Sequence, residues 1–174
     1  MPRFHAAGGG DGPEEVLDGV LAACRDLAWR PHARRLAILV GNAPPHGVGT
    51  SGDSFPQGCP CGETIDSATA AAERARVTFC ALGLTTAVAD SFARLSRATG
   101  GAFFSASQGD AAIEQLKTIL TSEFGNLDFD RRVLAAQLDD RERSLAELAV
   151  LLAAPRMAVA AAISRLERRD LLSE

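Results

Sequence analysis

The chain has 174 residues, enough for one compact domain and a small appendage, and its 47% hydrophobic and 23% charged residues are typical of a globular fold. A formal net charge of −4 provides no overall field that draws the protein to nucleic acid or to an anionic membrane. No apolar run approaches the roughly 20 residues needed to cross a bilayer, and the first residues lack the apolar core of a signal peptide. We therefore expect a cytoplasmic protein without a membrane partner.

Helix and strand patterns alternate over the first 124 residues. Apolar residues recur at helical spacing from Val16 to Leu27, and Leu36–Val40 is a short apolar run, typical of a strand covered on both faces. The alternation continues with helices predicted over 67–74, 88–98 and 111–124 and strands over 77–82 and 102–105. Because the connections are mostly short, this order predicts a parallel sheet with helices on both faces. We expect an α/β domain over residues 1–124, with three strands of a partial doubly wound parallel sheet.

A glycine-rich turn, Gly8–Gly12, precedes the first predicted helix. Asp11 is of a type that caps helix N-termini, Glu14 follows three residues later, and Pro13 is tolerated in a first turn. This spacing predicts a capping box that begins the helix at this point.

From Gly125 onward the strand pattern stops, and helices are predicted over 129–138, 144–152 and 156–169. Ser144 and Glu147 form a capping-box pattern at the start of the second helix. A short helix, a tight turn through Pro155 and a longer helix indicate a helix-turn-helix. We expect residues 125–174 to form a small all-α tail with this core: Leu148, Ala149, Leu152, Val159, Ile163 and Leu166.

Three stretches of the chain occur in the order and approximate spacing of a von Willebrand factor A domain. They are Gly8–Glu14, Leu39–Gly47 and Ala98–Gly101, and the region that resembles this family covers about residues 8–107. The branch that it most resembles is the one associated with alpha-kinases and bacterial relatives. The tail resembles the helix-turn-helix core of bacterial winged-helix proteins. The resemblance implies a sheet of strand order 3-2-1-4-5-6, of which our three strands would be the last three, and a role in protein–protein interaction.

The family's metal-ion-dependent adhesion site holds Mg²⁺ through three loops. The resemblance places the second loop at Asp11 and the third at Asn42, whereas the first loop, Asp-x-Ser-x-Ser, is absent from this sequence. One carboxylate and one amide do not make a tight Mg²⁺ site, because this ion prefers near-octahedral oxygen coordination with carboxylates. We expect a weak remnant site that binds Mg²⁺ only if a missing N-terminal half is supplied. On this hypothesis the chain is a fragment, and the strand at Leu36–Val40 leaves an open edge that favours self-association.

The long loop of residues 41–62 contains His46, Cys59 and Cys61, which are ligand types that Zn²⁺ accepts. In a reducing compartment we expect these cysteines to be free thiols or metal ligands rather than disulfides. Cys80 lies in an apolar strand pattern, where a thiol behaves as a small hydrophobe. A Cys-x-Cys pair with no second pair favours a structural loop, and a thiol or metal site remains the alternative.

The surface of the last helix would read DNA if the tail were a DNA-binding domain. It presents side chains that are mostly poor at reading bases: Arg156, Met157, Ala160, Ala161, Ser164 and Arg165. Residues 126–174 carry nine acidic residues and eight arginines, so the tail is nearly neutral, although phosphate contacts dominate DNA affinity. We therefore favour docking or dimerisation over DNA binding.

The sequence contains no nucleophile elbow, no His-Glu-x-x-His and no phosphate-binding loop with its lysine. We expect a non-enzymatic module that binds an unidentified protein partner, without an assured cofactor. The alternative is a regulator whose tail binds DNA, and a metal or thiol enzyme that uses the His46–Cys61 loop ranks third.

Overall fold

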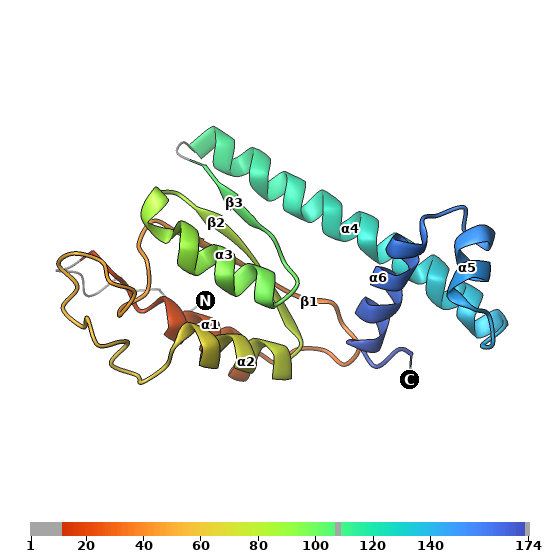
Figure 1. The fold of residues 1–174 in the computed structure, drawn as a ribbon, viewed down its shortest axis with the longest axis horizontal. Coiled ribbons are helices and arrows are strands. Elements are labelled where there is room, and N and C mark those ends of the chain that lie inside the picture. Colours follow the sequence, from red (N-terminus) through yellow and green to blue (C-terminus); the bar gives the residue numbers. More distant parts are fainter. Residues whose placement is uncertain (1–11, 107–108, 173–174) are drawn as a thin grey trace. The chain divides into compact units, whose positions relative to one another are not determined.

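The computed structural model of the chain describes residues 12–106 and 109–172. These residues form two compact units, which share the long helix α4 (Figure 1). The first comprises the described residues of Met1–Ala28 and Leu36–Gln115, and the second those of Trp29–Arg35 and Leu116–Glu174. The short segment Trp29–Arg35 thus belongs to the second unit, although it stands between two parts of the first.

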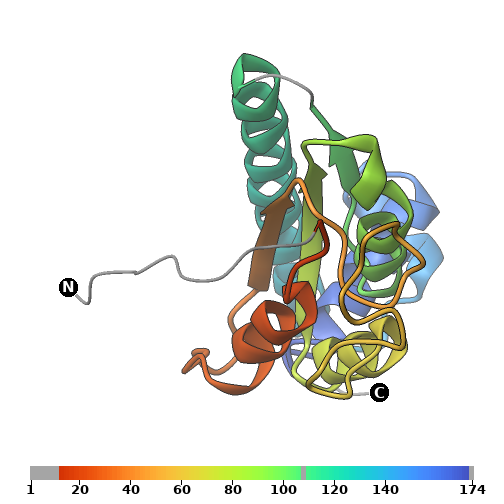
Figure 2. The ribbon, with the colours of Figure 1, turned by 90° about the vertical axis from the view of Figure 1, so that its left-hand side faces the viewer.

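A three-stranded parallel sheet forms the centre of the first unit (Figure 2). Its strands are, in spatial order, β1 (Arg35–Gly41), β2 (Val77–Gly83) and β3 (Phe103–Ser105). β2 pairs in parallel with β3, with Ala81 opposite Phe103, and the N–H of Leu84 donates to the carbonyl of Gly41 at 2.9 Å where β1 ends. The predicted α/β class with three strands is confirmed.

The two longer strands differ in burial. Every residue of β2 is buried, as its apolar sequence from Val77 onward predicts. β1 is half-buried along most of its length, and Val40 is 48% exposed. The expectation that Leu36–Val40 is covered on both faces is therefore wrong. In the described residues β1 is an outer strand that pairs with β2 alone, and fewer elements pack over an outer strand than over a central one.

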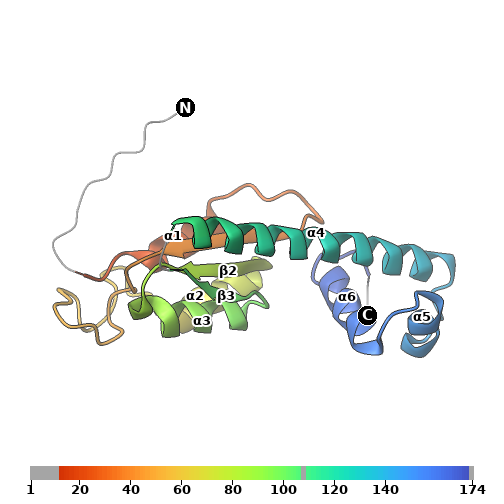
Figure 3. The same cartoon turned by 90° about the horizontal axis from the view of Figure 1, so that it is seen from above.

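Three helices belong wholly to the first unit: α1 (Val16–Arg25), α2 (Ile65–Arg74) and α3 (Ala89–Ala98), the last preceded by a 3₁₀ turn over Thr86–Val88. α2 and α3 contact β2 from the same side (Figure 3), and α1 packs beside α2 (Figure 1). The buried face of α2 consists of Ala68, Ala71 and Ala72, whose small side chains allow its neighbours to approach closely. Phe92 of α3 is 1% exposed and packs against Ala81 and Val88.

The start of α1 differs from the prediction. The helix begins at Val16, and Glu15 occupies the N-cap without a side-chain hydrogen bond to the first turn. Glu14 is extended instead, because its N–H donates to the carbonyl of Pro44 at 2.9 Å in an isolated parallel bridge with Pro45. The capping-box prediction for Glu14 is therefore wrong, and Gly8–Gly10 and Asp11 lie outside the described residues.

In the turn between α3 and β3, Thr99 and Gly101 both contact the backbone of β2. The buried hydroxyl oxygen of Thr99 accepts a hydrogen bond from the N–H of Phe79 at 3.0 Å, which satisfies a donor of β2. A Cβ atom at Gly101 would overlap the carbonyl of Phe79, so only glycine fits this approach to the strand. The Ala98–Gly101 stretch therefore has a packing role in this fold.

α4 runs without interruption over Gly109–Asp139. The sequence predicts two helices with a break near Gly125 and a domain boundary at residue 124, and the structure shows that the predicted break is wrong. A single exposed glycine costs a helix about 1 kcal/mol, which is less than the helical tendency of the flanking segments provides. The boundary between the two units falls inside the helix, after Gln115.

The second unit contains two further helices, α5 (Leu145–Leu151) and α6 (Arg156–Glu167), which are bent by 110° at the turn between them. This angle lies in the range of helix-turn-helix units. The predicted capping box of Ser144 and Glu147 is confirmed. So is the predicted core, since all six of its members lie in or against one apolar cluster around Val133.

Across the described part of the chain, no single helix is long and apolar enough to cross a membrane. Only α5 and α6 taken together have sufficient length and composition, and they are bent by 110°.

Candidate functional site

The connection over residues 42–64, the rim loop, leaves the carboxyl end of β1 and leads to α2. Asp53 anchors it: its carboxylate accepts hydrogen bonds from Nδ1 of His46 at 2.7 Å and from the N–H groups of Gly47 at 2.7 Å and Phe55 at 2.8 Å. The side chains of Asp53 and His46 are 1% and 5% exposed. The His46 ring also contacts the Phe55 ring edge-on, with centroids 5.0 Å apart. The rim loop is therefore folded around a polar core of its own.

The pKa of Asp53 reflects this core. Burial alone would raise it, but the hydrogen bonds from Gly47, His46 and Phe55 together outweigh burial and lower the pKa below its ordinary value. Asp53 is therefore a carboxylate near neutral pH, and each donor that faces it has a charged acceptor.

Glycines bring the two ends of the rim loop together. Gly47 has φ of +77° and Gly58 has φ of +129°, in a region that other residues rarely adopt. A Cβ atom at Gly47 would overlap the backbone of Gly58, so the two arms of the loop are in backbone contact at this point. The contact places Cys59, which follows Gly58, beside His46 and the start of α1.

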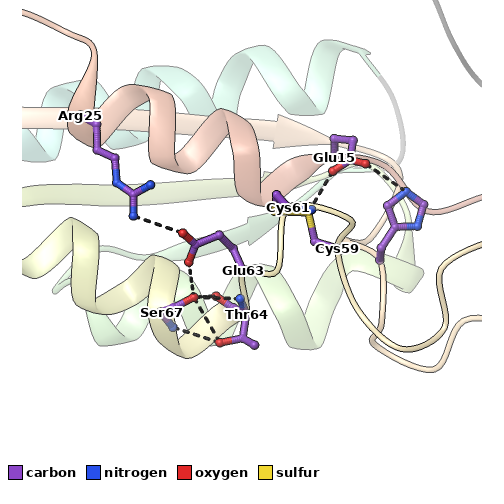
Figure 4. The surroundings of a disulfide bond; sticks show 8 residues. Glu15, Arg25, Cys59, Cys61, Glu63, Thr64 and Ser67 are labelled. Carbon is purple, nitrogen blue, oxygen red and sulfur yellow. Dashed lines mark hydrogen bonds and ion pairs between the residues drawn. A yellow bond between two sulfur atoms is a disulfide. The ribbon is translucent and has the colours of Figure 1, made fainter.

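Cys59 and Cys61 are joined by a disulfide, with their Cα atoms 5.2 Å apart (Figure 4). The expectation of free thiols at these two positions is therefore wrong for this structure. The tight turn between them brings the Cα atoms within the usual range for a disulfide. Cys24 and Cys80 are not disulfide-bonded, and Cys80 is buried in β2 as predicted. Burial raises the pKa of the Cys24 thiol, and nearby Arg25 partly opposes this effect.

Two carboxylates at the start of α1 lie beside this sulfur pair. Oε2 of Glu15 lies 3.0 Å from Sγ of Cys59, and Oε1 of Glu15 lies 4.0 Å from Nε2 of His46 (Figure 4). Ligand atoms of Glu15, Asp18, Cys59 and Cys61 all lie within 4.8 Å of one another. Cys59 is buried, whereas the other three residues are exposed. The loop and the helix thus bring together four groups that are capable of holding a metal ion.

A cavity of about 490 Å³ opens next to this cluster. Its walls come from the rim loop, from Leu17 of α1 and from the first turns of α2 and α3. The charged side chains that line it are Glu63, Asp66, Asp90 and Arg94. Arg94 donates to Asp66 at 2.5 Å, and both side chains are more than half exposed. Three carboxylates and one guanidinium therefore give the cavity a negative lining.

A hydrogen-bond network holds the wall of the cavity at the start of α2 (Figure 4). The hydroxyl of Ser67 donates to Glu63 at 2.6 Å, and Arg25 of α1 donates to the other oxygen of Glu63 at 3.2 Å. The hydrogen bond from Ser67 is the main cause that lowers the pKa of Glu63, burial opposes it, and Arg25 adds to the lowering. Thr64 and Ser67 form a capping box, so α2 begins at a fixed position against the loop.

The two predicted remnant Mg²⁺ ligands are not brought together in the described residues. Asp11 lies outside them. Asn42 is exposed at the start of the rim loop, and its backbone carbonyl accepts a hydrogen bond from the hydroxyl of Thr85 at 2.7 Å. Asn42 thus links the connections that leave β1 and β2, and the remnant site stays a prediction.

The predicted surface of α6 is only partly available for contacts. Arg156, Met157 and Ser164 are exposed, with Met157 81% exposed, and Ala160 is half-buried. Arg165 instead donates from Nε and Nη2 to the carboxylate of Asp130, at 3.0 Å and 2.7 Å. The Asp130 side chain is only 1% exposed, so this ion pair belongs to the interior of the second unit. The prediction that Arg165 belongs to the contact surface of α6 is therefore wrong.

Other arginines of the second unit are also engaged in internal contacts. Arg132 donates to the carbonyl of Leu152 at 3.2 Å, and Arg169 donates to the carbonyl of His32 at 2.9 Å. Arg143 donates to the carbonyl of Ala136 at 2.5 Å and to Asp139 at 2.6 Å. These guanidinium groups are engaged within the second unit, which leaves fewer of them to contact phosphates.

The sequence analysis missed the charged partners of the rim loop. Glu15 and Asp18 were not singled out, although their spacing of three places both carboxylates on one face of a helix. The charged residues that line the cavity were missed because they come from three separate elements. The fold of the rim loop, including the contact between Gly47 and Gly58, brings these elements together, and no local pattern encodes that contact.

Comparison with known proteins gives one partial match. A segment of 68 residues, 38% of this chain, is 40% identical to the alpha-protein kinase vwkA of Dictyostelium discoideum. The chain spans 11% of the length of that relative. No protein-family model matches the chain. No solved structure matches it.

Proposed function

We propose that this chain is a cytoplasmic, non-catalytic interaction module of the von Willebrand factor A type, which binds a protein partner at the carboxyl edge of its sheet. The observation that carries the proposal is the cavity bounded by the rim loop and the starts of α2 and α3. In open α/β sheets, ligands bind in the crevice outside the carboxyl ends of the strands. The cavity lies beyond the ends of β1 and β2, where such a ligand is expected.

The charges of the cavity define the chemistry of the partner. Glu63, Asp66 and Asp90 contribute carboxylates, and Arg94, the cationic side chain among the charged lining residues, is paired with Asp66. A lysine or arginine side chain of a partner gains attraction in such a cleft, because complementary charge favours both encounter and register. We infer that the partner presents a basic segment, with one cationic side chain inserted beside Asp90.

The name of the partly matching relative raises the alternative of a kinase. A kinase must hold the phosphates of ATP, which bring several negative charges into the site. Kinases offset these charges with a lysine and with Mg²⁺, whereas the described residues that line the cavity include no lysine, and its Arg94 is paired with Asp66. The match covers 11% of that relative, so the shared segment is compatible with a part of it other than the catalytic part. The charge of the cavity therefore supports a binding role.

The sequence resemblance supports the von Willebrand factor A type, and the partial match to an alpha-protein kinase agrees with the branch that the sequence most resembles. In this proposal the partner does not bind through the Mg²⁺ of an adhesion site, because Asn42 supplies an amide in place of a carboxylate. The proposed cytoplasmic location implies that Cys59 and Cys61 are reduced there, because disulfides are rare in that compartment.

A peptide selection tests the proposal. Random 12-residue peptides displayed on phage are selected on the immobilised chain, and the enriched peptides are then synthesised and titrated against it. We expect enrichment of lysine and arginine. Asp90→Lys should weaken the selected peptides at least about tenfold, which corresponds to about 1.4 kcal/mol, and millimolar Mg²⁺ should leave the affinity unchanged.

Asp26→Lys is the matched control, because it makes the same charge change at the end of α1, away from the residues that line the cavity. Peptides without a cationic side chain, or peptides that bind the Asp90→Lys and Asp26→Lys variants equally well, would contradict the proposed site. Binding of Mg²⁺-ATP by the parent chain, weakened more by Asp90→Lys than by Asp26→Lys, would favour the kinase alternative.

A further inference from the structure

The two sulfur atoms of the rim loop lie close to the carboxylates of Glu15 and Asp18, which a disulfide offers no proton to bind. A disulfide sulfur carries no proton, so the contact of Glu15 with Cys59 at 3.0 Å gains no hydrogen bond in the oxidised state. A thiol proton or a cation between the carboxylate and the sulfur would make this contact attractive. The surroundings of Cys59 therefore fit the reduced pair better than the disulfide.

Reduction supplies two thiolates to a cluster that already holds two carboxylates. The four ligand atoms of Glu15, Asp18, Cys59 and Cys61 lie within 4.8 Å of one another. A tetrahedral Zn²⁺ site, with bonds of about 2.3 Å to sulfur and about 2.1 Å to oxygen, needs its ligand atoms about 3.4–3.8 Å apart. Once the S–S bond is broken, shifts of about 1–2 Å would bring the four atoms to this spacing.

The frame of the cluster is fixed on both sides. On the helix side, the parallel bridge between Glu14 and Pro45 holds the residue next to Glu15 against the loop. On the loop side, the contact of Gly47 with Gly58 holds the residue next to Cys59. His46 donates from Nδ1 to Asp53, and its Nε2 lies 4.0 Å from Oε1 of Glu15, so the buried imidazole borders the cluster.

We propose that the reduced chain binds one Zn²⁺ ion through Cys59, Cys61, Glu15 and Asp18. Thiolates select Zn²⁺ over Mg²⁺ or Ca²⁺, and its double charge offsets half of the four negative charges of the ligands. The disulfide and the ion exclude each other, because sulfur atoms bonded to one another no longer act as thiolates. The ion would fasten the rim loop to the first turn of α1, beside the cavity.

Metal binding by the whole purified chain tests this site without any partner. The chain is reduced with a phosphine under nitrogen, titrated with Zn²⁺ against a chromogenic chelator and analysed for bound metal. We expect one Zn²⁺ per reduced chain and none per chain oxidised with hydrogen peroxide. Co²⁺ in place of Zn²⁺ should give the absorption of thiolate-to-metal charge transfer.

Variants identify the ligands. Cys59→Ser and Cys61→Ser should each lose stoichiometric binding, and Glu15→Gln should weaken it at least tenfold. Asp18→Asn should also weaken Zn²⁺ binding. Because Asp18 is exposed, this variant tests the site even if a cysteine variant fails to fold. The matched controls are Cys24→Ser and Asp26→Asn, which change a cysteine and a carboxylate outside the cluster and should leave the affinity within twofold.

The absence of stoichiometric Zn²⁺ from the reduced chain would overturn the site, as would equal binding by the oxidised chain. So would a loss with Cys24→Ser that matches the loss with Cys59→Ser. Because the peptide selection uses Asp90 and this titration uses the sulfur pair, failure of one does not entail failure of the other.

Discussion

Asp53 is the residue on which the rim loop depends most. It accepts three hydrogen bonds, and its neighbour His46 is buried with it. An asparagine at this position would turn a donor toward groups that are donors themselves, so the loss exceeds that of one charge. The loop should then loosen from Gly47 to Phe55.

We predict that Asp53→Asn lowers the free energy of unfolding at neutral pH and flattens its dependence on acid. The folded pKa of Asp53 lies below the unfolded value of about 3.9. Its contribution is therefore fully present above that value and is lost as the pH falls through the folded pKa. Urea unfolding at pH 7 and pH 3 measures both effects. An equal loss between these pH values in the variant and the parent would contradict the prediction.

Asp130 and Arg165 form the buried ion pair of the second unit. We predict that Asp130→Ala lowers the free energy of unfolding by about 3–5 kcal/mol, because it leaves the guanidinium without its partner. Replacing both residues with leucine should lower the free energy of unfolding less than Asp130→Ala alone does, because no unpaired charge is left buried. Trp29, the single tryptophan of the chain, lies in the same unit and reports unfolding by fluorescence.

Asp128→Ala is the control for this pair. Asp128 is exposed and lies 3.9 Å from Arg131, so its removal should change the free energy of unfolding by less than about 0.5 kcal/mol. Equal costs for Asp128→Ala and Asp130→Ala would show that burial of the pair does not matter.

Among the elements, α4 provides the sharpest test of the fold, because the sequence suggested two helices and the structure has one. We predict that Gly125→Ala raises the free energy of unfolding by about 1 kcal/mol, since alanine is the better helix former and open space surrounds the added Cβ. Thermal unfolding followed by circular dichroism measures this change. A loss of stability would indicate that the chain turns at Gly125 with a positive φ.

Gly101→Ala is the opposite case and serves as the comparison. Its added Cβ would overlap the carbonyl of Phe79, so the strand or the turn must move. We expect the substitution to lower the free energy of unfolding by about 1–3 kcal/mol. The two substitutions thus distinguish a glycine that only weakens its helix, at position 125, from a glycine that close packing requires, at position 101.

The elements also show which parts of the structure were predictable. The strands, α2 and α3, and the core around Leu148 follow from apolar spacing, which the local sequence carries. The start of α1 was misplaced because Glu14 forms its backbone hydrogen bond with Pro44, thirty residues away. Cys59 and His46 were candidates by residue type alone. Their partners Glu15 and Asp53 required the folded loop, because each contact joins residues that no helical or strand period relates.

For the whole molecule, the distribution of arginines bears on whether it binds DNA. Arg165 binds Asp130, and Arg132 binds the carbonyl of Leu152. Arg143 binds Asp139 and the carbonyl of Ala136. Residues 126–174 carry nine acidic residues against eight arginines. Affinity for DNA rises with the number of phosphates that free cationic side chains neutralise, and few such side chains remain here.

We therefore predict that the intact chain binds a random 30-base-pair duplex no more tightly than about 10⁻⁴ M at physiological salt, the weak end of non-specific binding. Fluorescence anisotropy of a labelled duplex, measured at two salt concentrations, checks this value. Arg156→Glu, at the exposed start of α6, should change the signal little. Submicromolar affinity that falls steeply with salt and is lost in Arg156→Glu would mean that α6 enters a groove of DNA, and the tail would then be a reader of nucleic acid.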